Sequence, residues 1–143
     1  MNQSPTNRSV PTDILLPHIF YRDVSTAIEW LEHVFGFVEH YRYGTPVSGA
    51  QLRAVGGWIM VAQARGRGPA ELGYGTQYLT VFTEDVEAHF LRVKTAGGRI
   101  VEDLHETVYG EFQFGVEDLD GHRWIFSRHA RDLSPAEWGA RIR

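Results

Sequence analysis

The feature that most constrains the fold of this chain is an internal repeat. When the 143-residue sequence is shifted by 62 positions, Ile19-Phe20 aligns with Val81-Phe82 and Asp23-Val24 aligns with Asp85-Val86. Further hydrophobic and glycine positions coincide under the same shift: Ile28 with Phe90, Leu31 with Val93, Gly36 with Gly98 and Val38 with Ile100. A repeat of this kind predicts two similar units that bury their hydrophobic faces together, because one unit alone cannot cover its own.

Each copy predicts the element order β-α-β-β-β. An apolar run opens each copy, at residues 14–21 and 78–83, and Asp23 or Asp85 then suits the N-cap of an amphipathic helix. Glycine ends each helix, and three strand candidates follow, at 37–43, 50–55 and 58–63 in the first copy and at 99–104, 110–117 and 122–127 in the second. The prediction is an α+β fold of two tandem modules whose mixed sheets curve around a cleft.

The repeat also sets the expected domain boundaries. Residues 1–13 are polar and are expected to form a flexible leader before a single domain at 14–128, whose modules span 14–63 and 77–128. Between the modules, residues 64–75 are rich in glycine and charge, as is typical of a connector. The tail at 129–143 contains Ser134-Pro135-Ala136-Glu137, a capping box that predicts a short terminal helix around Trp138.

Composition excludes several classes of function. There is no cysteine, which excludes disulfides, thiolate catalysis and cysteine-containing zinc sites. The net charge of -4 gives no indication of a nucleic-acid interface, which would need a clustered basic face. No apolar run approaches the roughly 20 residues that span a bilayer, and the leader has no apolar segment of a secretory signal. We expect a cytoplasmic protein without nucleic-acid or membrane partners.

With these motifs in order, the chain resembles the glyoxalase, bleomycin-resistance and extradiol-dioxygenase group, the vicinal oxygen chelate superfamily. The similarity covers roughly residues 14–128. It is carried by six motifs: Phe20-Tyr21-Arg22-Asp23-Val24 running into Ala27-Ile28-Glu29-Trp30-Leu31, Val34-Phe35-Gly36-Phe37, Thr83-Glu84-Asp85-Val86-Glu87-Ala88-His89, Ala96-Gly97-Gly98-Arg99-Ile100, Tyr109-Gly110-Glu111, and Glu117-Asp118-Leu119-Asp120-Gly121-His122-Arg123-Trp124.

The resemblance implies a divalent-metal site that this chain lacks. Enzymes of the superfamily hold the metal with four side chains, and the corresponding positions here are Leu16, Met60, Tyr78 and Ile125. First-row divalent ions prefer imidazole and carboxylate ligands, so we expect no metal cofactor and assign no catalytic residue. A divalent metal held by an atypical set around His18 is the alternative.

Strand alternation places a group of side chains on the cleft side of the sheets. His18 is expected to face the cleft, where it contacts a ligand, acts as an acid or base, or replaces a lost metal ligand; the plainer interpretation is a packed histidine. The remaining ligand-binding candidates are Phe20, Trp58, Met60, Tyr78, Thr80 and Phe82 as an aromatic wall, with Glu111 and Arg123 at the rim. The competing interpretation is that these wall residues fill a core between the modules.

A metal site around His18 would need partner ligands, and the sequence pattern places none of the other histidines as such a partner. His33 and His89 fall on helices and His40 on an edge strand, where solvated surface is the expected setting. His105-Glu106 is expected in a loop, and His122 directly follows the Asp-Gly turn.

Taken together, the sequence favours a metal-free binding protein that resembles the bleomycin-resistance branch. The resemblance implies that it binds a small aromatic or cationic molecule in an aromatic cleft, as a homodimer. The alternative is an enzyme of the same superfamily, a lyase, isomerase or dioxygenase that uses a metal or proton transfer by His18 and Tyr78. A purely structural or protein-binding module is a third hypothesis.

Overall fold

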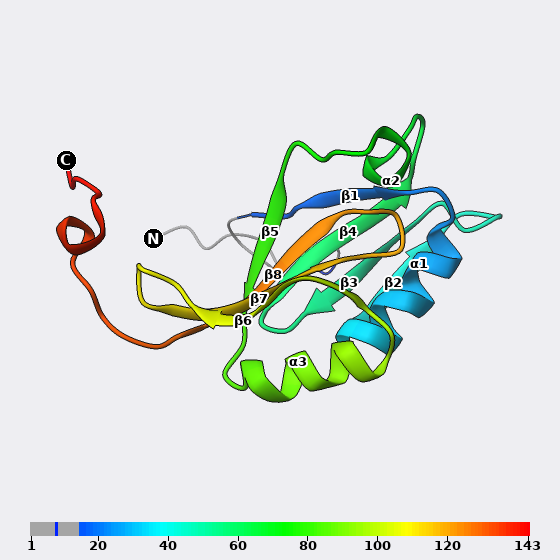
Figure 1. Cartoon of the computed structure of the whole chain (residues 1–143). Coiled ribbons are helices and arrows are strands. Elements are labelled where there is room, and N and C mark those ends of the chain that lie inside the picture. Colours follow the sequence, from blue (N-terminus) through cyan, green and yellow to red (C-terminus); the bar gives the residue numbers. More distant parts are fainter. Residues whose placement is uncertain (1–7, 9–14) are drawn as a thin grey trace, which may run out of the picture.

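The computed structural model describes Arg8 and residues 15–143, and it contains two four-stranded mixed sheets (Figure 1). The leader predicted at residues 1–13 lies, apart from Arg8, outside the described residues. In the first module the chain runs through β1 (His18–Tyr21), α1 (Val24–Trp30), a π-helical turn η1 (Leu31–Phe35), β2 (Val38–Tyr43), β3 (Gly49–Ala54) and β4 (Gly57–Gln63). The second module comprises β5 (Tyr78–Phe82), α3 (Val86–Thr95), β6 (Arg99–Glu106), β7 (Glu111–Glu117) and β8 (Arg123–His129).

The two sheets have the same topology, which confirms the predicted repeat. Their strand orders are β1-β4-β3-β2 and β5-β8-β7-β6, with the first pair of each order parallel and the other pairs antiparallel. The helix starts are equivalent as well, since Asp23 accepts a hydrogen bond from the Thr26 backbone N–H at 3.0 Å and Asp85 accepts one from that of Ala88 at 3.1 Å. The fold is therefore the α+β arrangement of tandem β-α-β-β-β modules.

The two modules share one hydrophobic core on the helix-covered faces of their sheets. Phe35, at the end of η1, packs against Trp124 and Phe126 of β8, with ring centroids 5.5 and 4.9 Å apart. Phe37 packs against Trp124 from the same side, at 5.5 Å. Burying these rings between the modules is strongly favourable and joins the two repeats into one body.

On the opposite faces of the sheets, apolar side chains lie open to solvent. The alternation in β1 buries Ile19 and Tyr21 against the helices and exposes His18 and Phe20, as predicted. Phe20, Tyr78 and Phe82 are 53%, 61% and 59% exposed. These side chains belong to helix-free faces that the rest of the described chain leaves largely uncovered.

Two expectations from the sequence are wrong in their local detail. His105 and Glu106 lie in β6 and not in a loop, because pairing with Gln113 and Phe112 of β7 extends the strand. His89 is not a solvated side chain, since it lies on the sheet-facing side of α3 and its ring centroid is 4.2 Å from that of Phe126. The connector between the modules contains a short helix, α2 (Pro69–Leu72).

The last ordered element is the 3₁₀ helix η2 (Pro135–Trp138), which lies where the capping box predicts a helix. The backbone N–H of Ser134 donates to Glu137 Oε2 at 2.7 Å, as the box requires. Among the residues that the structure describes, no helix is both long enough and apolar enough to cross a membrane.

Candidate functional site

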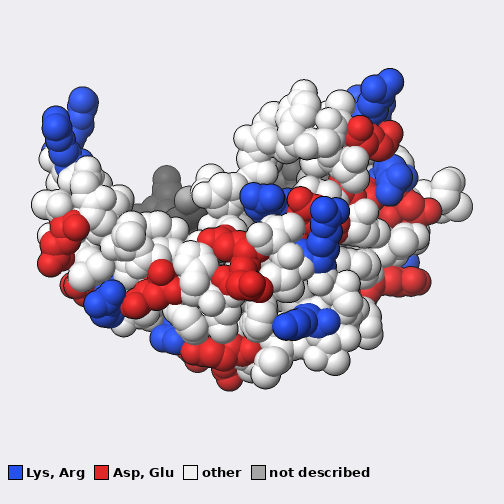
Figure 2. Space-filling view, viewed as in Figure 1, with Lys and Arg blue, Asp and Glu red and all other residues white. Residues whose placement is uncertain are grey.

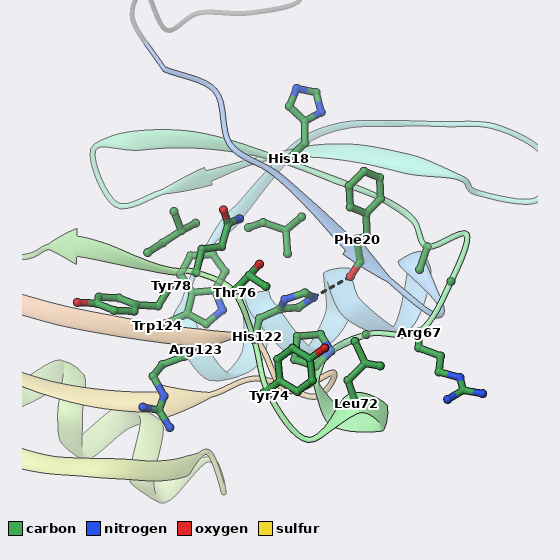
Figure 3. A pocket seen from close by; sticks show the side chains of 18 of the residues that line it. His18, Phe20, Arg67, Leu72, Tyr74, Thr76, Tyr78, His122, Arg123 and Trp124 are labelled. Atoms are coloured by element: carbon green, nitrogen blue, oxygen red, sulfur yellow. Dashed lines mark hydrogen bonds between the residues drawn. The ribbon is translucent and has the colours of Figure 1, made fainter.

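A pocket of about 530 Å³ lies where the starts of β1 and β5 meet the connector between the modules (Figure 3). Three parts of the chain form its walls: residues 18–20 of the first module, residues 64–69, 72 and 74–79 of the connector and β5, and residues 122–124 after the β7–β8 turn. The lining is aromatic and apolar for the most part, with Phe20, Leu72, Tyr74, Tyr78 and Trp124 among it.

The connector is fixed to the second module by helix α2. Gly68 precedes the helix, Pro69 opens it, and Gly73, in the left-handed region at φ 82°, ends it and turns the chain toward Tyr74. The backbone N–H of Ala70 donates to the carbonyl of Asp120 at 3.0 Å. A Cβ on Gly121 would lie 2.6 Å from that same Ala70 nitrogen, so a glycine is needed for this approach.

The other wall is held by hydrogen bonds between β1 and the β7–β8 turn. The His122 Nε2 atom lies 2.7 Å from the carbonyl oxygen of Phe20, a contact in which the ring donates (Figure 3). Two residues further along the chain, the backbone N–H of Arg22 donates to Asp120 Oδ2 at 2.7 Å and the guanidinium contacts Oδ1 at 3.2 Å. These bonds join residues about a hundred positions apart and keep Phe20 and His122 at the pocket.

Beneath this wall, the buried carboxylate of Asp118 accepts four hydrogen bonds. Oδ2 accepts from the Tyr21 hydroxyl at 2.6 Å and from Trp124 Nε1 at 3.0 Å, and Oδ1 accepts from the backbone N–H groups of Asp120 and His122, both at 3.0 Å. Burial raises the pKa of the Asp118 carboxyl, while the donors oppose that rise. Burial and the adjacent Asp118 raise the pKa of Tyr21 well above its ordinary value, so Tyr21 stays a proton donor.

The charged groups of the lining are all basic or imidazole side chains: His18, Arg65, Arg67, His122 and Arg123. Among the residues that the structure describes, no aspartate or glutamate lines the pocket. In the close view Arg67 and Arg123 extend outward on opposite sides, and the ring of His18 points away from the other labelled side chains (Figure 3). The wider surface is different, because basic and acidic side chains are interspersed over the face seen in Figure 2.

Four of the side chains predicted to bind a ligand line this pocket: His18, Phe20, Tyr78 and Arg123. The other five do not. Thr80 and Phe82 lie further along β5 on the exposed face, and Glu111 contacts His129 Nδ1 at 3.1 Å. Trp58 packs on His40, with ring centroids 5.3 Å apart, and Met60 Sδ accepts from Gln51 Nε2 at 3.6 Å.

Sequence reasoning missed the contribution of the connector. Arg65, Arg67, Leu72 and Tyr74 were part of a segment interpreted only as a linker, and Thr76, His122 and Trp124 were not placed at a site. One signal was present, since Leu72 and Tyr74 are large apolar side chains in an otherwise polar, glycine-rich stretch. Such residues indicate a connector that packs against something.

The positions that correspond to a metal site offer poor ligands for a divalent ion. Met60 and Ile125 are buried and Leu16 is aliphatic, which leaves the Tyr78 phenol as the one oxygen donor of the four. Over the described part of the chain, no group of three or more His, Cys, Asp or Glu side chains is arranged to hold a metal ion. This donor set does not fit the imidazole and carboxylate preference of first-row divalent metals.

Comparison with known proteins extends these observations. The chain is similar to TioX from Micromonospora sp. ML1, with 32% identity and a TM-score of 0.68 over 82% of this chain and 99% of that one. A glyoxalase/bleomycin resistance protein/dioxygenase from Alicyclobacillus acidocaldarius shares the fold at 17% identity, with a TM-score of 0.69 over 85% of this chain and 94% of that one. An uncharacterized protein of Mycobacterium tuberculosis is 27% identical over 133 residues, which cover 86% of this chain and 78% of the relative.

The family model of these proteins matches residues 14–126, nearly the span over which the sequence motifs occur. The paired β-α-β-β-β sheets and the solved relatives agree with that match. The chain belongs to the Glyoxalase/Bleomycin resistance protein/Dioxygenase superfamily.

Proposed function

We propose that this protein binds a small aromatic molecule in the pocket at the junction of the two modules, without a metal cofactor. The observation that carries the proposal is the pocket itself, with a volume of about 530 Å³ and walls supplied by the side chains of Phe20, Leu72, Tyr74 and Tyr78. Volumes of roughly 300–1,000 Å³ with apolar walls and a few polar groups are typical of small-molecule sites.

The position of the pocket also supports ligand binding. Two of its walls are fixed by the hydrogen bonds of Asp118, Asp120 and His122, so those walls are preorganised before a ligand arrives. The third wall is the connector, where Tyr74 is 64% exposed and makes no aromatic contact among the described residues. Its ring is therefore available to stack on a planar ligand.

A binding screen with one variant and one control tests this proposal. Aromatic compounds of one to three rings are screened by ligand-observed NMR, and affinities of the hits are measured by calorimetry. Tyr74→Ala is expected to weaken binding by about tenfold, the loss of one stacking contact. Tyr109→Ala is the matched control, since that ring packs on Trp138 and does not line the pocket. Equal effects of the two substitutions on every hit would contradict the pocket as the site.

Metal independence is tested separately. The protein is purified without an affinity tag, its metal content is measured, and it is titrated with Zn, Mn, Ni and Fe(II) while thermal stability is followed. We expect no stoichiometric metal and no concentration-dependent stabilisation. Stoichiometric metal or a large stabilisation would contradict the proposal and favour the metal-dependent enzyme, the alternative that the superfamily implies.

A cytoplasmic homodimer remains the expected state of the protein. Phe20, Tyr78 and Phe82 on the helix-free faces are the kind of exposed apolar side chains that a second copy would cover. Sedimentation equilibrium at micromolar concentration measures the mass, and a monomer under these conditions would contradict this expectation. Fractionation of the native host's cells tests the location.

A further inference from the structure

We propose that the pocket selects an anionic aromatic ligand, one whose ring system carries a carboxylate or a comparable acidic group. This inference rests on the proposed function and names its ligand class. Because the whole chain has a net charge of -4, its overall charge favours the opposite class, a cationic guest. The local charges of the pocket decide between the two.

The charges that line the pocket have one sign. Arg65, Arg67 and Arg123 contribute three guanidinium groups, His18 and His122 contribute imidazoles, and no carboxylate from the described part of the chain lines the wall. The remaining polar side chains, Thr76 and Gln77, are uncharged. A cationic ligand would find no counter-charge here, whereas an anionic ligand would find several.

Two of the arginines are free to engage a ligand. Among the described residues no ion pair or hydrogen bond involves the guanidinium of Arg65 or Arg67. Arg123 is only partly neutralised, because its contact with Glu117 is long, at 3.7 Å, and Glu117 also pairs with Arg99 at 3.4 Å. Two arginines therefore share one carboxylate.

A neighbouring hollow provides a contrast within the same molecule. It has a volume of about 890 Å³, lies against the same residues 74–78, and has Glu117 and Asp118 among its lining residues beside Arg99 and Arg123. Glu117 and Asp118 thus belong to the lining of the second hollow and not to that of the first. The charged side chains that line the aromatic pocket are therefore basic, whereas those that line the second hollow are of both signs.

The arrangement of the side chains sets the orientation of the ligand. The aromatic side chains of Phe20, Tyr74 and Tyr78 line the pocket, while Arg67 and Arg123 extend outward from opposite sides (Figure 3). Arg67 stands between Gly66 and Gly68, which leave the backbone around it unusually free to reorient. The acidic group therefore lies toward the mouth, where a guanidinium binds it in a bidentate manner, and the rings lie inside.

A matched set of three ligands tests the proposal: 2-naphthoate, its neutral amide 2-naphthamide, and the cation 2-naphthylmethylammonium. Affinities for the full-length protein are measured by calorimetry at low and at moderate salt. The expected order is naphthoate first, by about tenfold over the amide, and the cation last, with the preference for naphthoate shrinking as salt rises.

Paired substitutions assign this preference to the arginines. The double variant Arg65→Gln/Arg67→Gln is expected to lose about tenfold in naphthoate affinity while its naphthamide affinity changes less than about twofold. Arg53→Gln is the control, because Arg53 is an exposed arginine on β3 that does not line the pocket. An equal loss of affinity for naphthoate and naphthamide would show that the arginines shape the pocket without recognising the charge of the ligand. That result would overturn the proposal.

The outcomes separate this inference from the function on which it rests. If the amide or the cation binds as tightly as naphthoate, and Tyr74→Ala weakens that binding, the pocket is a ligand site and the anionic class is wrong. If none of the three compounds binds saturably at millimolar concentration, the anionic ligand class is overturned. The proposed function is overturned as well only if the wider aromatic screen yields no ligand whose binding depends on Tyr74.

Discussion

Asp118 occupies a position at which one side chain serves both the fold and the pocket. Its two oxygens accept hydrogen bonds from Tyr21 in the first module, from Trp124 in β8 and from two backbone N–H groups of the β7–β8 turn. Because Trp124 and His122 line the pocket, this carboxylate positions part of the wall without being exposed to a ligand. A buried acceptor with all of its donors satisfied is expensive to remove.

Asp118→Asn should therefore destabilise the protein by about 2–4 kcal/mol, since an amide offers one acceptor oxygen in place of two and brings N–H groups toward other donors. Urea unfolding followed by circular dichroism measures the change. Asp103→Asn is the control, because Asp103 is exposed on β6 and has no ion pair within the described chain. A loss below about 1 kcal/mol for Asp118→Asn would show that the network adapts to the amide.

His89 predicts a pH dependence of stability. Its ring packs against Phe126, its Nε2 is buried without a hydrogen-bond partner, and burial, with a smaller effect of Arg92, lowers its pKa to about 4. A lowered folded-state pKa means that the stability is present above the unfolded pKa of about 6.5 and is lost as pH falls toward 4. Allowing for partial exposure, the loss attributable to His89 is about 1.5 kcal/mol between pH 7 and pH 5.

His89→Phe should remove this component, because phenylalanine keeps the ring packing and does not titrate. Unfolding free energies at pH 7 and pH 5 are compared for the wild type, for this variant and for His33→Gln, which changes an exposed histidine. The slope with pH should be shallower only in His89→Phe. Identical slopes in all three proteins would mean that other groups carry the acid sensitivity.

At the scale of elements, the connector is the segment that makes the sheets into a site. Helix α2 has only four residues, and its docking depends on the bond from the Ala70 N–H to Asp120 and on the absence of a side chain at Gly121. Between α2 and β5, residues 74–77 pass along the pocket and the second hollow alike. A change in how α2 docks would therefore reshape both.

Gly121→Ala is expected to displace α2 as well as to strain the turn. Gly121 and Gly97 have nearly equal φ values, 85° and 86°, but a Cβ at Gly121 meets the Ala70 backbone whereas one at Gly97 meets nothing within 4 Å. Gly97→Ala should cost about 1 kcal/mol from the positive φ alone, and Gly121→Ala about 1–2 kcal/mol more. Faster hydrogen exchange at the Ala70 amide in Gly121→Ala would confirm the displacement, and equal destabilisation in both variants would contradict it.

The whole molecule behaves as one body because its core does not stop at the module boundary. The rings of Phe35 and Phe37 from the first module lie against Trp124 and Phe126 of the second, and α3 lies beside η1 (Figure 1). Neither sheet has a separate core of its own on the helix side. The two repeats should therefore unfold together.

Phe35→Ala tests this cooperativity. The substitution removes a ring that touches both modules and should lower the free energy of unfolding by about 4 kcal/mol. The amides of β3 and β7 should lose their protection from hydrogen exchange at one urea concentration, which is lower than in the wild type. Val38→Ala, at an exposed position of β2, should change stability by less than about 0.5 kcal/mol. Separate transitions for β3 and β7 would show that the modules are independent.

The sequence by itself determined the modules. Eight strands and the two long helical segments lie within a few residues of their predicted positions, because alternation of side chains, helical periodicity, Asp caps and glycine ends act over a few residues and leave a local pattern. The same alternation told which face of β1 would carry His18 and Phe20. Its errors, at His89 and at His105-Glu106, occurred where a tertiary partner changed the environment of a residue.

Only the tertiary structure decided which of those side chains meet at a site. Periodicity indicates which face of a strand a residue occupies, but it does not indicate which distant segment lies opposite that face. His18, Phe20 and Tyr78 therefore line a pocket while Trp58 and Phe82, predicted with them, do not. The arginines of the connector reach the pocket because α2 docks on the β7–β8 turn, a contact between residues some fifty positions apart. The positive local charge of the pocket follows from that contact and not from the net charge of the chain. A ligand responds mainly to charges within about 10 Å, because salt screens the more distant ones.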